Sequence, residues 1–149
     1  MQSIAILFAL LSSYLNVPTV YAQDYSPVSY LIESKVSLDQ DTVSWLATTT
    51  EKYADQYGQN AYIAIDIMYC ESHFRFHITS PTNDVGLMQI NKIHLGEAKK
   101  MGLNLYDPED NIHFGFYLMS IHPDLHDWSA SKYCWIKHPI SGGSPAKDS

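Results

Sequence analysis

One glutamate in the sequence has the setting of a general acid. Glu71 follows a largely apolar segment, residues 61–68, and Phe74 and Phe76 come shortly after it. A carboxyl group in apolar surroundings resists ionisation, so its pKa rises. Such a group can protonate a leaving oxygen near neutral pH. The alternative is a solvated glutamate at the end of a helix, because most glutamates in proteins are exposed.

The histidines offer two pairs with the spacing of a metal site. His73 and His77 are four residues apart, as are His122 and His126, and such a pair can bind zinc when it shares one face of a helix. Neither pair belongs to an H-E-x-x-H motif, and Pro123 interrupts the second. The sequence also has no glycine-rich phosphate loop and no G-x-S-x-G motif. We therefore expect neither a metal nor a cofactor.

The N-terminal residues have the composition of an export signal. Residues 4–15 are mostly apolar, and Val20-Tyr21-Ala22 ends on a small residue, as signal cleavage sites do. The first three residues lack the usual Lys or Arg, and residues 4–22 are just long enough to cross a bilayer. We expect residues 1–22 to be a signal peptide, with an uncleaved membrane anchor as the alternative.

Charge and cysteine content restrict the partners and the compartment. The net charge of −7 argues against nucleic acid and anionic lipid as partners. An anionic polymer would have to be held by local hydrogen bonds and aromatic contacts. The two cysteines, Cys70 and Cys134, indicate one disulfide in an exported chain and two separate thiols in a cytosolic one.

Helices must position Glu71 and the residues around it. Capping residues and apolar spacing predict one helix from Asp39 or Asp41 to Gly58, and a second from Asn60 that delivers Glu71 at its C-terminal end. The second helix is apolar on almost all sides, so we expect it to be buried.

The segments outside these two helices are more varied. Residues 23–38 are mixed in character and predict a linker or a loosely packed N-terminal arm. Residues 72–85 predict a loop, with a short hairpin as an option, and residues 139–149 are rich in Gly, Ser and Pro, which is typical of a disordered tail. Further helices are predicted over residues 95–101, from Asp107 onward, and over residues 128–133.

The order of several short motifs resembles a known catalytic domain. The motifs are Glu71-Ser72, Ser80-Pro81, Gly86-Leu87-Met88-Gln89-Ile90-Asn91, Asp107-Pro108-Glu109-Asp110-Asn111-Ile112, Tyr117-Leu118 and Tyr133. Over roughly residues 40–136 this order resembles the soluble lytic transglycosylases, whose catalytic domain has a lysozyme-like fold related to goose-type lysozyme. The resemblance implies one domain, residues 39–138, that is mainly α-helical, with a substrate cleft and at most a small β element.

The resemblance also implies roles for the matched residues. Glu71 is implied as the sole catalytic acid and base. The implied substrate-binding residues are Ser80, Gly86, Gln89, Asn111 and Tyr133. Among them, Gly86 would let the backbone approach the substrate, Asn111 would support the site from beneath, and the Tyr133 hydroxyl would lie close to Glu71.

Both cysteines stand where the sequence departs from the usual family pattern. Cys134 replaces the expected Asn after Tyr133, and Cys70 directly precedes Glu71. Because the family places Glu71 and Tyr133 close together, the resemblance implies a Cys70–Cys134 disulfide, as in a small branch of lysozyme-like domains.

The activity implied by the resemblance is cleavage of peptidoglycan glycan strands between N-acetylmuramic acid and N-acetylglucosamine, leaving a 1,6-anhydro end. One alternative is a hydrolysing muramidase with Asp84 positioning water, because water-using glycosidases normally have a second carboxylate. A second alternative is a non-catalytic wall-binding domain of the same fold. Each hypothesis places the protein outside the cytoplasm, in the periplasm, at the cell wall or secreted, either released or tethered through residues 4–22.

Overall fold

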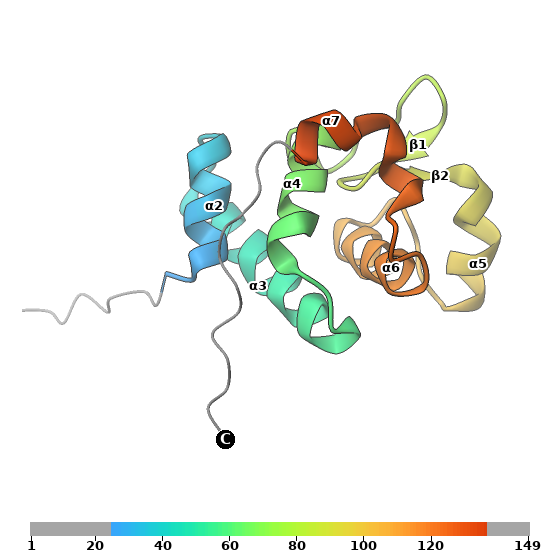
Figure 1. Cartoon of the computed structure of the whole chain (residues 1–149), viewed down its shortest axis with the longest axis horizontal. Helices are drawn as coiled ribbons and strands as arrows, with labels where there is room; N and C mark the ends of the chain where they lie inside the picture. Colours follow the sequence, from blue (N-terminus) through green and yellow to red (C-terminus); the bar gives the residue numbers. More distant parts are fainter. Residues whose placement is uncertain (1–24, 137–149) are drawn as a thin grey trace, which may run out of the picture.

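The computed structural model describes residues 25–136, which fold mainly into helices (Figure 1). The α-helices are α2 (Pro27–Lys35), α3 (Gln40–Tyr57), α4 (Ala61–Ser72), α5 (Leu95–Lys100), α6 (Pro108–Ile121) and α7 (Lys132–Trp135). Two 3₁₀ helices, η1 (Lys92–His94) and η2 (His126–Ser131), join them, with a small antiparallel sheet of β1 (Asp84–Val85) and β2 (Ile90–Asn91). The prediction of a mainly helical domain with a small β element is confirmed.

The expected signal peptide, residues 1–22, and the expected tail, residues 139–149, lie outside the described residues. Within residues 25–136, no helix combines the length and the apolarity that crossing a membrane requires.

Capping residues set the ends of the helices that carry the site. Asp39 and Asn60 each accept hydrogen bonds from backbone N–H groups in the first turn of α3 and α4. Gly58 ends α3 in the left-handed conformation, with φ of 62°. Asp107 caps α6, and Pro108 occupies its first turn. These local interactions are those that the sequence predicts.

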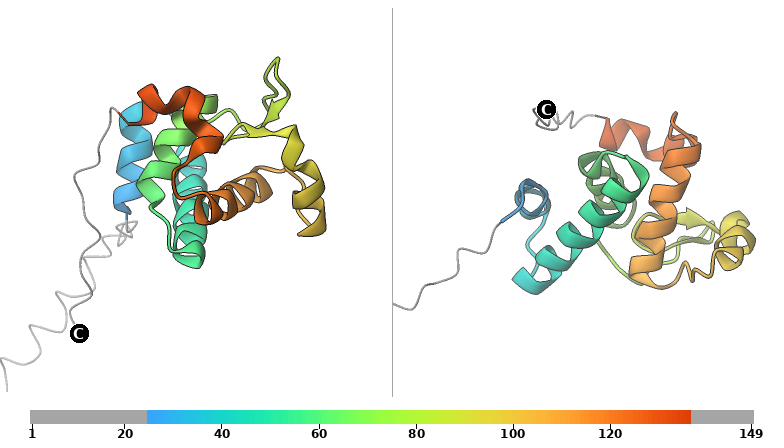
Figure 2. Two further views of the ribbon diagram at one scale, coloured as in Figure 1. Left: turned by 45° about the vertical axis from the view of Figure 1, so that its right-hand side comes forward. Right: turned by 90° about the horizontal axis from the view of Figure 1, so that it is seen from below.

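The helices lie on two sides of α4. In Figure 1 and in the right-hand view of Figure 2, α2 and α3 lie on one side of α4, and the β-hairpin and α5 lie on the other. Helix α6 packs against α3, and η2 and α7 pack against α4. The core that they enclose is apolar and includes Val43, Leu46, Ile65, Ile67, Met68, Leu87, Phe114, Phe116 and Leu118.

The expectation of a linker or loosely packed arm over residues 23–38 requires correction. Ser26 caps α2 and Pro27 occupies its first turn, so a helix begins in this segment. Val28 and Ile32, one turn apart, are both buried in the core. Helix α2 therefore belongs to the packed domain and contacts both α3 and α4.

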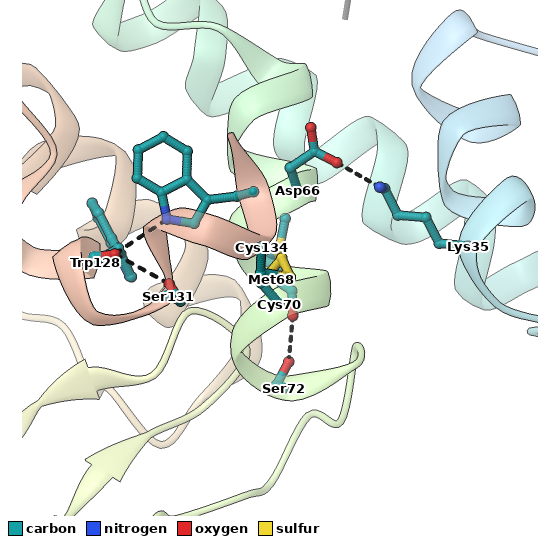
Figure 3. The surroundings of a disulfide bond; sticks show 9 residues. Lys35, Asp66, Met68, Cys70, Ser72, Trp128, Ser131 and Cys134 are labelled. Carbon is teal, nitrogen blue, oxygen red and sulfur yellow. Dashed lines mark hydrogen bonds and ion pairs between the residues drawn. A yellow bond between two sulfur atoms is a disulfide. The ribbon is translucent and has the colours of Figure 1, made fainter. Parts of the chain in front are cut away.

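A buried ion pair ties α2 to α4. The Lys35 ammonium lies 2.5 Å from the Asp66 carboxylate, and the two side chains are only 7% and 2% exposed (Figure 3). Lys35 also lies over the ring of Tyr69, 5.1 Å from its centroid. Two charges removed from water must be paired with each other, so this contact constrains how α2 docks on α4.

We expect Asp66→Asn to lower the free energy of unfolding by about 3–5 kcal/mol, because it leaves the Lys35 ammonium buried without its counter-ion. Urea denaturation followed by circular dichroism measures this loss. The exposed Lys52–Glu109 pair, 2.7 Å apart, provides the matched control, and Lys52→Met should leave stability nearly unchanged. Equal effects of the two variants would contradict a structural role for the buried pair.

Candidate active site

The end of α4 places Glu71 in a partly buried position with an altered acidity. Burial raises the pKa of the Glu71 carboxyl above its ordinary value, the nearby Ser131 hydroxyl lowers it in part, and the negative charge of Asp84 raises it. The last turn of a helix carries the negative end of the helix dipole, which also disfavours a carboxylate. Glu71 is therefore suited to hold a proton at a pH where an exposed glutamate would lose it.

The chain reverses direction immediately after Glu71. His73 and Phe74 both adopt left-handed conformations, with φ of 52° and 57°, and Phe74 is buried. Ser72 is buried as well, and its hydroxyl donates to the Met68 carbonyl at 2.9 Å. Two consecutive left-handed residues other than glycine carry backbone strain, and such strain is concentrated at functional sites. The turn fixes the point at which the Glu71 side chain leaves the helix.

Asp84, at the start of the hairpin formed by β1 and β2, is held in one orientation by hydrogen bonds from that hairpin and from the loop before it. The hydroxyls of Ser80 and Thr82 donate to Asp84 Oδ2 at 3.0 and 2.6 Å, and the Asn91 amide donates to Oδ1 at 2.5 Å. The Ser80 hydroxyl oxygen also accepts the backbone N–H of Asp84 at 3.0 Å. Ser80 thus lies in the same network as the carboxylate whose charge acts on Glu71.

Asn111 fastens this hairpin to α6. The side chain is completely buried, accepts the Met88 N–H at 2.9 Å and donates to the carbonyls of Val85 and Leu105 at 2.9 and 3.0 Å. These bonds engage both the oxygen and the nitrogen of the Asn111 side chain within the protein and join the hairpin to α6.

Gly86 is needed for the same contact. Its φ is 76°, and an added Cβ would lie 2.3 Å from the Asn111 side-chain nitrogen. Any larger residue would therefore displace Asn111. The close approach that the structure shows at Gly86 is to Asn111; the approach to substrate that the resemblance implies stays a prediction.

Gln89 stands at the turn between the two strands in a strained conformation, with φ of 48°. Its amide nitrogen donates to the Gly86 carbonyl at 2.8 Å. Gln89 also lines a cavity of about 260 Å³, together with His126 and Trp128. The buried Trp128 donates its indole N–H to the Met88 carbonyl at 2.7 Å, which joins η2 to the hairpin.

No hydrogen bond joins the Tyr133 side chain to Glu71 among the described residues. Tyr133 is 80% exposed and makes no hydrogen bond within residues 25–136. The neighbouring Cys134 is bonded to Cys70 of α4, and the Tyr133 side chain is exposed to solvent. Ser131, at the end of η2, is the hydroxyl residue beside Glu71. The sequence analysis missed it, although it lies in the segment that the resemblance aligned.

The predicted disulfide is present. Cys70 and Cys134 are bonded, with Cα atoms 5.8 Å apart and a separation of 64 positions in sequence (Figure 3). Trp135 extends the connection, because its indole N–H donates to the Trp128 carbonyl at 3.1 Å, and Ser131 donates to the same oxygen at 3.1 Å. The bond thus fastens the end of α4, which carries Glu71, to the segment that carries Ser131.

The described site has one carboxyl group, that of Glu71, in a partly buried position with a raised pKa. A family model described as Transglycosylase SLT domain matches residues 48–129, more than half of the chain. The chain belongs to this family. The match includes Glu71, the hairpin and Asn111, and it ends before Tyr133. None of the curated proteins compared with the chain is similar enough to count as a match.

Membership of the SLT family has consequences for substrate and location. SLT domains act on peptidoglycan, so glycan strands are the substrate class and the site of action is outside the cytoplasm. The family also indicates an activity of the lytic transglycosylase type.

Proposed function

We propose that this SLT domain is a peptidoglycan lytic transglycosylase that cleaves between N-acetylmuramic acid and N-acetylglucosamine and leaves a 1,6-anhydro end. The observation that carries the proposal is Glu71, a partly buried carboxyl with a raised pKa at the end of α4 in a domain of this family. We further propose that residues 1–22 direct export, so that the domain reaches the wall.

In the proposed reaction, Glu71 performs both proton transfers. Its protonated carboxyl donates to the bridging oxygen as the bond to the muramic acid C1 breaks and positive charge develops on the ring. The Glu71 carboxylate then takes the proton from the C6 hydroxyl, whose oxygen bonds to C1 and closes the anhydro ring. Glu71 regains its proton in this step, so the reaction needs no second catalytic carboxylate and consumes no water.

Other residues of the site are assigned supporting roles. Ser131 is proposed to orient the Glu71 carboxyl, since its hydroxyl is the neutral group that acts on the Glu71 pKa. Ser80 and Gln89 are proposed to contact the sugar near the cleaved bond. Asn111 and Gly86 act indirectly, by holding the hairpin that carries them.

A hydrolysing muramidase is the second candidate, and the position of Asp84 favours it. The negative charge of Asp84 raises the pKa of Glu71, so the two carboxyl groups are near each other. A carboxylate that positions water would also lie near the acid. However, Asp84 accepts hydrogen bonds from Ser80, Thr82 and Asn91, which occupy both of its oxygens. Because both oxygens already accept hydrogen bonds from the protein, Asp84 is poorly placed to hold a water molecule. This supports the transglycosylase as the first candidate.

Mass spectrometry of the muropeptides released from purified sacculi separates the two reactions. We expect ends of 1,6-anhydro-muramic acid, and we expect Asp84→Asn to keep appreciable activity with the same product. Because Asp84→Asn removes a negative charge that raises the Glu71 pKa, the alkaline limb of the activity profile should move to lower pH. Reducing muramic acid ends, together with an inactive Asp84→Asn variant, would favour the muramidase.

A further inference from the structure

A cluster of three histidines and one aspartate lies where three segments of the chain meet. His94 ends η1, His122 directly follows α6, and His126 and Asp127 begin η2. Asp127 is at the centre, with Oδ2 2.7 Å from His122 Nδ1 and Oδ1 3.3 Å from His94 Nε2. None of these four residues is assigned a role in the proposed reaction.

The structure removes the sequence argument against a metal at this place. Pro123 was expected to separate His122 from His126, since two such residues normally share a helix face to bind zinc. Helix α6 ends at Ile121, and Leu125 turns the chain with φ of 55°. The His122 and His126 rings consequently lie with centroids 4.2 Å apart, without a shared helix.

The donor atoms are close to the spacing of a zinc site. One nitrogen from each of His122 and His126 and one oxygen of Asp127 lie within 4.8 Å of one another. Donors around tetrahedral zinc, at about 2.0–2.1 Å from the ion, are about 3.3 Å apart. His126 is 55% exposed, so rotation of its side chain can supply a closing movement on the order of 1 Å.

The surroundings of His126 match those of a metal ligand. Its Nδ1–H donates to Asp124 Oδ1 at 2.8 Å, which leaves Nε2 as the free donor nitrogen. Metal-binding histidines commonly donate their other ring N–H to a carboxylate in this way. His94 is oriented as well, by Phe114, whose ring centroid lies 5.9 Å from that of His94.

We propose that His122, His126 and Asp127 bind one zinc ion. Imidazole nitrogens with a single carboxylate suit zinc and related transition metals, whereas calcium and magnesium require oxygen ligands. The ion would join the end of α6 to η2. Helix η2 ends at Ser131, beside Glu71. His94, His126 and Asp127 line the cavity that also contains Gln89. The ion would therefore stabilise one wall of the site and take no part in the reaction.

Isothermal titration of the purified, disulfide-bonded protein with zinc chloride tests the proposal. The protein should carry no histidine tag and should first be dialysed against a chelator. We expect one zinc ion per chain and a melting temperature that rises with zinc concentration, because the ion binds the folded state. His126→Ala should weaken binding at least about tenfold, and Asp124→Asn should weaken it by a smaller factor.

His77→Ala is the matched control, since His77 is also an exposed histidine but lies outside the cluster, and it should bind zinc as the wild type does. His126 is mostly exposed, so its variant should fold normally, which circular dichroism in chelator verifies. The proposal would be overturned by the absence of saturable binding at sub-millimolar zinc. Equal affinity of the wild type and His126→Ala would overturn it as well.

Discussion

Glu71→Gln should reduce the release of soluble fragments from purified sacculi by about 10²–10⁴-fold, the usual contribution of a general acid. The substitution preserves the shape of the side chain and removes the transferable proton. Initial rates of turbidity loss, measured over a range of pH, would report the effect. In the wild type, activity should fall as pH rises through the raised pKa of Glu71, because the carboxyl must be protonated to act.

The same variant should not lose stability, and this distinguishes a catalytic role from a structural one. The pKa of Glu71 is raised in the folded protein, so the folded state binds the proton more tightly than the unfolded state. The free energy of unfolding therefore falls as pH rises from the Glu71 pKa of the unfolded chain to that of the folded protein, and it stays at the lower value above this range. Gln at this position avoids that loss, so Glu71→Gln should melt no lower than the wild type at neutral pH.

Glu51→Gln supplies the control for this experiment. Glu51 lies on α3 with a partly exposed side chain and makes no hydrogen bond or ion pair within residues 25–136. The same chemical change there should leave activity and melting temperature unaltered. Near-normal activity of Glu71→Gln, with an intact circular dichroism spectrum, would remove Glu71 from the catalytic role.

Local chemistry explains why parts of this fold could be predicted from sequence. The starts of α3, α4 and α6 are set by Asp39, Asn60 and Asp107, side chains that bond to backbone groups two or three residues away. The burial of α4 follows from its lack of a polar face. Helix α2 was missed because its mixed composition hides a short buried stripe, although Ser26-Pro27 is a normal helix start.

The candidate site was predictable only where its position depends on nearby residues. Glu71 and the hairpin residues follow from motifs whose members are close in sequence. The neighbour of Glu71 on η2 depends on how the chain turns between Trp128 and Cys134, and no local pattern specifies that turn. The resemblance implied Tyr133 as a neighbour of Glu71 and gave no sign of Ser131, whose hydroxyl acts on Glu71 in the folded chain. The packing of Gly86 on Asn111 is a tertiary contact of the same kind.

Removal of the Cys70–Cys134 bond should lower the free energy of unfolding by roughly 4 kcal/mol, because the unfolded chain regains the freedom of a loop that spans 64 residues. The chain has two cysteines, so reduction with dithiothreitol acts on this bond alone. Urea denaturation with and without the reductant would measure the change. The Cys70→Ser/Cys134→Ser variant should match the reduced protein and should not respond to dithiothreitol.

Activity should fall along with stability, under conditions where the reduced protein is still folded. The bond joins the end of α4 to α7, and the hydrogen bonds of Trp135 and Ser131 to the Trp128 carbonyl continue that connection into η2. Without the bond, Ser131 should hold the Glu71 carboxyl less firmly, and the pH profile of activity should shift as well as the rate. A reduced protein that loses stability yet keeps the full rate and an unchanged pH profile would show that the disulfide stabilises the fold without positioning the acid.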